Sequence, residues 1–215
     1  MLQMSLPRTG SAPALRGRIG AGFSPAPHRY HLYLRAGCPD SLRVRIALAL
    51  LGLEGEVSTT TLTPDAPDHA GLRRAYEATR HHHTGSLTVP ALCDTWSGRV
   101  VSDHTPDILD DLALRLAGRT APNPPAPAAH AHAHADAVRT LLDPAAPRAE
   151  RSAALESVER RLALHPYALP GDRPTVADAD LWVALRHPAT APAPGPHVRS
   201  YLRRLGTHPA FRIPA

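Results

Sequence analysis

The stretch from Tyr30 to Leu53 constrains the fold of this chain more than any other. It opens with a short run of alternating polarity, Tyr30–Leu34, which predicts a half-buried strand. After an Ala-Gly break, apolar residues recur every three or four positions, which predicts a helix with one packed face. Cys38 and Pro39 stand where this helix begins. The sequence therefore predicts a strand and a helix joined by a tight turn, with a cysteine at the helix start.

The position of Cys38 favours chemistry. Pro39 suits a first helical turn because its missing N–H would be unpaired there anyway. The free N–H groups and the positive end of the helix dipole favour thiolate over thiol, and the thiolate is the nucleophilic form. A lone cysteine is also commonly a small buried apolar residue. From this stretch alone, both interpretations stay open.

The segments after this helix continue a regular order. Residues 56–62 are rich in β-branched side chains, which predicts a strand. Strand, helix and strand within about 35 residues form a βαβ unit with parallel strands. Next we expect a short helix at 72–79 and a strand at 88–94 with Pro90 at its entry. A turn at 96–98 leads to a returning strand that begins at 100, and a helix follows from Thr105 to near Ala117. Thr105 is expected as the N-cap of that last helix, with Pro106 at the first helical position.

A composition change at Gly118 marks the domain boundary. Residues 118–129 form a proline-rich linker, and everything beyond it is typical of helices. The predicted organisation is a flexible arm (1–28), an α/β domain (29–117), the linker, and an all-helical domain (130–215), with helices at 134–142, 148–164, 175–185 and 198–205.

Composition excludes several classes of function. All 24 basic residues are arginine, a bias of GC-rich genomes, and the net charge of +5 is spread along a chain with few aromatics. Nucleic-acid binding therefore has little support. There is no run of 18 apolar residues and no signal-peptide core, so no membrane partner is expected. Two cysteines cannot build a disulfide scaffold, which favours a reducing, cytoplasmic location.

The predicted element order resembles a thioredoxin-like domain, and with the helical half it resembles a glutathione transferase. Four pieces resemble one branch, the glutathionyl-hydroquinone reductases (Xi class): RYHLYLRAGCP from Arg29, LRRAYEATRHHHTGSLTVPALCD from Leu72, GRVVSDHTPDIL from Gly98, and GDRPTVADADLWVALRH followed by YLRRLGTHPAFR from Gly171. The fold class implied is an α/β thioredoxin-like domain with a mixed four-stranded sheet, then an all-α transferase-type domain.

The resemblance also implies a mechanism and a site. Cys38 would attack the sulfur of an S-glutathionyl-hydroquinone, release the hydroquinone, and be cleared by a second thiol. A cis peptide before Pro90 would face Cys38, with Val89 binding the thiol peptide through its backbone. His104 and Thr105 would hold the γ-glutamyl end. The partners implied are a small-molecule thiol and an aromatic conjugate, without metal or redox cofactor, and a homodimer stays open.

Arg43, on the predicted helix, has two interpretations. It supports the thiolate of Cys38, or it is a solvated charge on a surface helix.

The chain departs from this family at the places that bind glutathione. Asp40 replaces a tryptophan after the Cys-Pro pair, Ser86 replaces an arginine, and His104 replaces a glutamate. Losing those charges predicts weak glutathione binding and leaves mycothiol, a sugar-based thiol, as an alternative co-substrate. The helical half is also shorter than usual. A second hypothesis follows: a catalytically degenerate transferase-fold protein that serves as a binding or interaction module.

Three further groups carry weaker signals. Cys93 follows the strand after Pro90 and is expected to be a buried packing residue. The histidines at 81–83 and at 130, 132 and 134 lack the ligand spacing of a metal site. Asp178 is expected to cap the helix that begins near Thr175.

Overall fold

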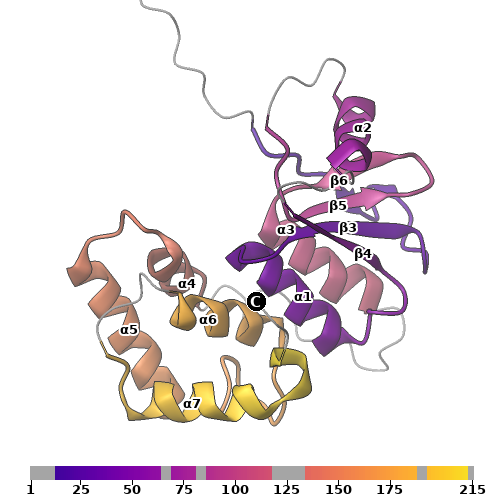
Figure 1. The fold of residues 1–215 in the computed structure, drawn as a ribbon. Coiled ribbons are helices and arrows are strands. Elements are labelled where there is room, and N and C mark those ends of the chain that lie inside the picture. The colour runs from indigo at the N-terminus through magenta and orange to yellow at the C-terminus, as the bar shows by residue number, and fades with distance from the viewer. Residues whose placement is uncertain (1–12, 64–68, 81–85, 118–133, 188–192, 213–215) are drawn as a thin grey trace, which may run out of the picture.

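Residues 13–63, 69–80, 86–117, 134–187 and 193–212 are described by a computed structural model of the chain. An α/β part comes first, and a group of helices packs beside it (Figure 1). The predicted linker, the histidines at 81–83, and His130 and His132 lie outside the described residues.

The α/β part is built on a four-stranded sheet. Its strand order is β4-β3-β5-β6, with bounds Ser58–Leu62, Tyr30–Arg35, Ala91–Asp94 and Arg99–Ser102. β3 pairs with β4 in parallel and with β5 in antiparallel, and β5 and β6 form the predicted hairpin. The thioredoxin-like, mixed four-stranded sheet is therefore confirmed.

Helices cover both faces of this sheet (Figure 1). α1 (Pro39–Leu51), α3 (Thr105–Asp110) and the π-helical turn η1 (Asp111–Leu116) lie on one face, and α2 (His69–Thr79) lies on the other. The alternation along β3 explains the division. Leu32 and Leu34 pack among α1 and α3, whereas Tyr33 points to the cluster that contains α2.

The helical half contains α4 (Ala135–Leu142), α5 (Arg148–Leu162), α6 (Val176–Arg186), α7 (Pro196–Thr207) and the 3₁₀ turn η4 (Pro209–Phe211). The four predicted helices are confirmed. α6 is buried almost all round, which makes it the central helix of this half. The predicted cap at its start is present, because the Thr175 N–H donates to the Asp178 carboxylate at 2.8 Å.

α1 is buried on two sides, not one. Val44 and Leu48 pack toward the sheet, whereas Ile46, with Leu42 beside it, belongs to the core of the helical half. The apolar spacing found in the sequence is the face that contacts α6, so α1 carries the contact between the two halves (Figure 1).

The segment predicted to be a flexible arm is packed from residue 13 onward. Two short strands, β1 (Arg18–Ile19) and β2 (Gly22–Phe23), form within it. Beyond the end of β6, the Leu15 N–H donates to Asp103 Oδ1 at 2.6 Å and the Leu15 carbonyl accepts the Asp103 N–H at 3.1 Å. Ile19 is 1% exposed in the core under α3. The expectation of a loose arm is therefore wrong for residues 13–28.

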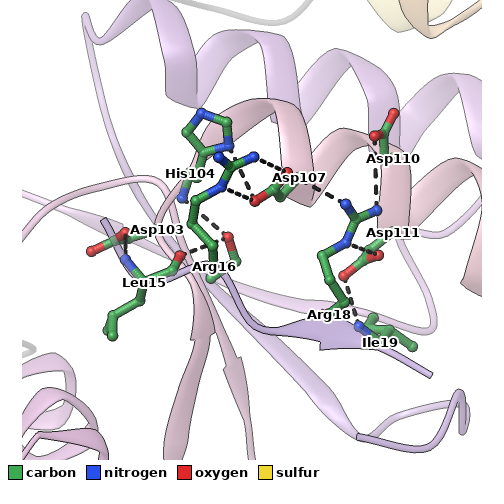
Figure 2. Close-up of polar contacts among 10 residues, drawn as sticks. Leu15, Arg16, Arg18, Ile19, Asp103, His104, Asp107, Asp110 and Asp111 are labelled. Carbon is green, nitrogen blue, oxygen red and sulfur yellow. Dashed lines mark hydrogen bonds and ion pairs between the residues drawn. The ribbon is translucent and has the colours of Figure 1, made fainter. Parts of the chain in front are cut away.

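Arginine–aspartate pairs fix this segment to α3 and η1 (Figure 2). Arg16 Nε lies 2.7 Å from Asp107 Oδ2, and Arg18 Nε lies 2.8 Å from Asp111 Oδ1. The partners are about ninety positions apart in the sequence, so no local pattern indicates them.

Candidate functional site

Cys38 is the N-cap residue of α1, as the sequence predicts. Its backbone is extended (φ −89°, ψ 119°), Pro39 follows in the first turn, and its carbonyl accepts the Leu42 N–H at 3.0 Å. The thiol is free and half-buried, and it makes no capping hydrogen bond. A half-exposed cysteine under the free N–H groups of a helix start has the placement of a nucleophile.

Cys38 opens into a cavity of about 390 Å³ between the two halves of the chain. One wall is the turn before α1 and the first two turns of that helix. The other wall is formed by the last turns of α6, the end of η4 and Arg212. In this wall Trp182 and Phe211 stand edge to face with ring centres 5.4 Å apart. The volume is within the range of small-molecule pockets, and the aromatic wall suits a planar ring.

The Val89–Pro90 peptide bond is cis, as predicted. Val89 is 8% exposed and lines a smaller neighbouring cavity of about 200 Å³. Arg35, at the end of β3, lines both this cavity and that of Cys38. That Pro90 faces the Cys38 sulfur stays a prediction.

His104 and Thr105 lie at the start of α3, shifted by one position from the expectation. The helix begins at Thr105, so His104 is the N-cap residue and the expected cap role of Thr105 is wrong. Pro106 fits equally well one position later, because several first N–H groups of a helix have no partner within it. His104 Nδ1 lies 3.2 Å from Asp107 Oδ2, the oxygen that Arg16 also contacts (Figure 2).

Asp107 therefore contacts three cationic or potentially cationic side chains, because Arg18 Nη1 also lies 3.4 Å from Asp107 Oδ1. The hydrogen bond from Arg16 is the main reason that the pKa of Asp107 is lowered. His104, one of the two residues that the resemblance assigns to the γ-glutamyl end of a thiol peptide, is thus next to a carboxylate of its own chain.

Arg43 is not the solvated surface charge that one interpretation expected, and its support of the Cys38 thiolate stays a prediction. It is only 8% exposed, and it donates to Asp180 of α6 and to Asp40 of its own helix, each at 2.7 Å. It ties α1 to α6 and balances the charge of Asp40 beside the Cys38 turn. With His104 it lines a third cavity of about 600 Å³.

Four of the six predicted site residues thus line three different cavities, whereas Pro90 and Thr105 line none of these three. Cys38 lines the first, Val89 the second, and Arg43 and His104 the third. Sequence reasoning missed Trp182 and Phe211, which contribute the aromatic wall opposite Cys38. Both belong to segments of the family resemblance, but the sequence alone does not show that they face Cys38.

The remaining candidates have structural roles. Cys93 is 5% exposed, and burial raises its pKa to about 12, so the predicted packing role is confirmed. His134 is buried 2.8 Å from the Ala168 carbonyl, and this burial lowers its pKa. Within the described ranges, no three histidine, cysteine or acidic side chains are grouped to hold a metal ion. No helix of those ranges has the length and apolar character to cross a membrane.

Comparisons with known proteins agree with this architecture. Residues 37–113 match the family model of the glutathione S-transferase N-terminal domain. Glutathionyl-hydroquinone reductase PcpF of Sphingobium chlorophenolicum is 32% identical over 112 residues, which are 44% of this chain and 36% of that protein. Glutathionyl-hydroquinone reductase YqjG of Escherichia coli is 28% identical over 128 residues, 46% of this chain and 39% of that protein. The aligned part thus spans less than two-fifths of these relatives.

Solved structures extend the likeness to the helical half. The Xi-class transferase of Natrialba magadii superposes with a TM-score of 0.71 at 21% identity, over 95% of this chain and 81% of that one. The Xi transferase of Phanerochaete chrysosporium gives 0.69 at 20% identity, over 96% and 88%. Residues 37–113 therefore match the glutathione S-transferase N-terminal domain, and the fold of the chain, including its helical half, is similar to that of the Xi-class structures.

Proposed function

We propose that this chain is a thiol-dependent reductase or transferase in which Cys38 is the nucleophile. The observation that carries the proposal is the position of this half-exposed thiol, at the start of α1 and at the wall of a cavity faced by Trp182 and Phe211. The two curated relatives are named glutathionyl-hydroquinone reductases, which supports an aromatic thiol conjugate as substrate.

The reaction has two steps. The Cys38 thiolate attacks the sulfur of the conjugate, an S–S bond forms, and the bond between that sulfur and the ring carbon breaks. The electron pair of the broken bond stays with the ring carbon, which takes a proton and is thereby reduced to the free hydroquinone. A second thiol then attacks the mixed disulfide, leaves as a disulfide of two small thiols, and returns Cys38 to its reduced form.

The thiol is glutathione or another low-molecular-weight thiol such as mycothiol. A glutathione-bound structure of YqjG is among the similar folds, which supports glutathione as the general class of ligand. His104, held by Asp107, and Ser86 lack the fixed charges that would pair with the ends of glutathione. Weak glutathione binding and a preference for a less charged thiol follow from this.

The experiment is a turnover assay with two conjugates of one hydroquinone, carrying glutathione and mycothiol respectively. The wild-type chain is expected to release hydroquinone from at least one of them when the matching thiol is supplied, and Cys38→Ser is expected to release none. Cys93→Ser is the matched control and should retain turnover. Release by Cys38→Ser at the wild-type rate would overturn the assignment. Absence of turnover and of binding with both conjugates would favour the degenerate binding module.

A further inference from the structure

Four arginines surround the cavity beside Cys38. Arg35 precedes the turn, Arg45 lies on α1, Arg186 is the last residue of α6, and Arg212 follows η4. The lining contains no aspartate or glutamate. We propose that this cavity selects aromatic compounds that carry an anionic ring substituent, a carboxylate in the simplest case. The proposal rests on the proposed function, because it names the substrate class of the same site.

The contacts of these arginines differ from those of the arginines that stabilise the fold. Arg16, Arg18, Arg29 and Arg43 each form an ion pair with an aspartate. Among the residues that the structure describes, none of the four cavity arginines has a carboxylate within 4.0 Å. Other described arginines, such as Arg203, also have no carboxylate within this distance, so what distinguishes these four is that they line one cavity whose lining has no acidic residue. Together they produce a concentrated positive potential at that cavity, which attracts an anion.

The aromatic wall of the cavity supplies the complementary apolar surface. Trp182 is 4% exposed, Phe211 is 3% exposed, and Leu42 and Val183 lie beside them. The guanidinium of Arg186 lies 4.4 Å from the centre of the Trp182 ring. This guanidinium lies over the Trp182 ring, so a ligand that contacts the wall also meets a cation.

A polar atom of this wall lacks a partner. The indole Nε1 of Trp182 is buried and donates to no acceptor in the described parts of the chain. Buried N–H donors normally have acceptors, and a ligand oxygen beside this wall would supply one. Cations at the rim, a planar apolar wall and an unused donor together fit a hydroxylated aromatic acid better than a neutral hydroquinone.

The thiol co-substrate also carries carboxylates, so the test uses ring compounds without any thiol. The Cys38→Ser chain is titrated calorimetrically with hydroquinone and with 2,5-dihydroxybenzoate, which differ only by the carboxylate. The acid is expected to bind about tenfold more tightly, the value of one charge-assisted contact. The ratio should fall when salt is raised from low to physiological ionic strength, because exposed charges are screened.

Substitutions locate the effect. Arg186→Gln combined with Arg212→Gln is expected to bring the two ligands to equal affinity. Arg203→Gln, at an exposed α7 arginine that does not line the cavity, is the matched control and should keep the tenfold ratio. In Trp96→Phe, Trp182 is the only tryptophan left, and its fluorescence should respond to the acid.

Three results would overturn the proposal: equal affinity for the two ligands in the parent chain, a ratio unchanged in the double variant, or no response from Trp182. The outcome is separable from that of the proposed function. Selective binding of the acid without turnover of any conjugate would contradict the reductase but keep the anion-selective cavity. Turnover of neutral and acidic conjugates at equal rates would keep the reductase and contradict the selectivity.

Discussion

Arg43 Nε lies 2.7 Å from Asp180 Oδ1 and so joins α1 of the thioredoxin-like half to α6 of the helical half. The same guanidinium bonds Asp40 through Nη1, at the turn that carries Cys38. Arg43, for which the sequence left open a role beside the thiol or a position in solvent, thus links the two halves. The walls of the Cys38 cavity come from both halves, so this contact also fixes the shape of the site.

Replacing Arg43 should therefore destabilise the chain. Arg43→Met leaves Asp40 and Asp180 without their shared cation, and both are partly hydrated, so we expect a loss of about 1–3 kcal/mol in the free energy of unfolding. Urea denaturation measures it. Arg45→Met, two positions along the same helix and without an ion pair in the described chain, should change stability by less than about 0.5 kcal/mol. Equal stability of the two variants would contradict the role given to Arg43.

A second buried pair should make stability depend on pH. Burial by itself would raise the pKa of Asp94, but hydrogen bonds from Arg29 and Ser97 outweigh it and lower this pKa to about 2. Because the folded pKa lies below the unfolded value, near 3.9, the pair contributes fully above about pH 4–5. Its contribution is lost as the pH falls toward 2.

The comparison of wild type with Asp94→Asn isolates that contribution. At pH 7 the variant should be less stable by about 2–3 kcal/mol, because Arg29 is left in a nearly buried position without its anion. The difference should shrink steadily below pH 4 in urea titrations. A gap that stays constant down to pH 2.5 would show that Asp94 does not titrate as described.

Cys93 offers a contrast to Cys38 within one chain. Cys93→Ser places a hydroxyl in the cluster between the sheet and α2, and we expect it to lower stability by about 1–3 kcal/mol. Thiol-transfer turnover at 25 °C should be nearly unchanged. The melting temperature and the turnover rate are measured on the same preparation. An unchanged melting temperature together with lost turnover would reverse the roles of the two cysteines.

Local patterns in the sequence predicted most of the architecture. Alternation predicted β3, three- and four-residue spacing predicted α1, and the Thr-Val-Ala-Asp run predicted the start of α6. Each of these depends on residues within a few positions of one another. The apolar face of α1 was also found, but its partner proved to be α6, since periodicity shows that a face is buried and not what covers it.

Long-range contacts explain what the sequence did not predict. Arg16 and Arg18 bind aspartates about ninety positions away in the sequence, and no local pattern indicates such contacts. Residues 13–28 were therefore predicted to be flexible. The Arg43–Asp180 pair spans 137 positions. The cavity beside Cys38 likewise combines the start of α1 with the end of α6 and the chain after η4, and only the folded chain brings its arginines and rings together.

The most direct test of the account is a single-turnover experiment with the second thiol withheld. The reduced chain is mixed with an excess of the S-conjugate that it turns over, and intact mass and released hydroquinone are measured together. One equivalent of hydroquinone should appear per chain, with a mass increase of one thiol that maps to the peptide containing Cys38 and disappears on reduction. Hydroquinone released without an adduct on Cys38, or an adduct on Cys93 instead, would contradict the central claim.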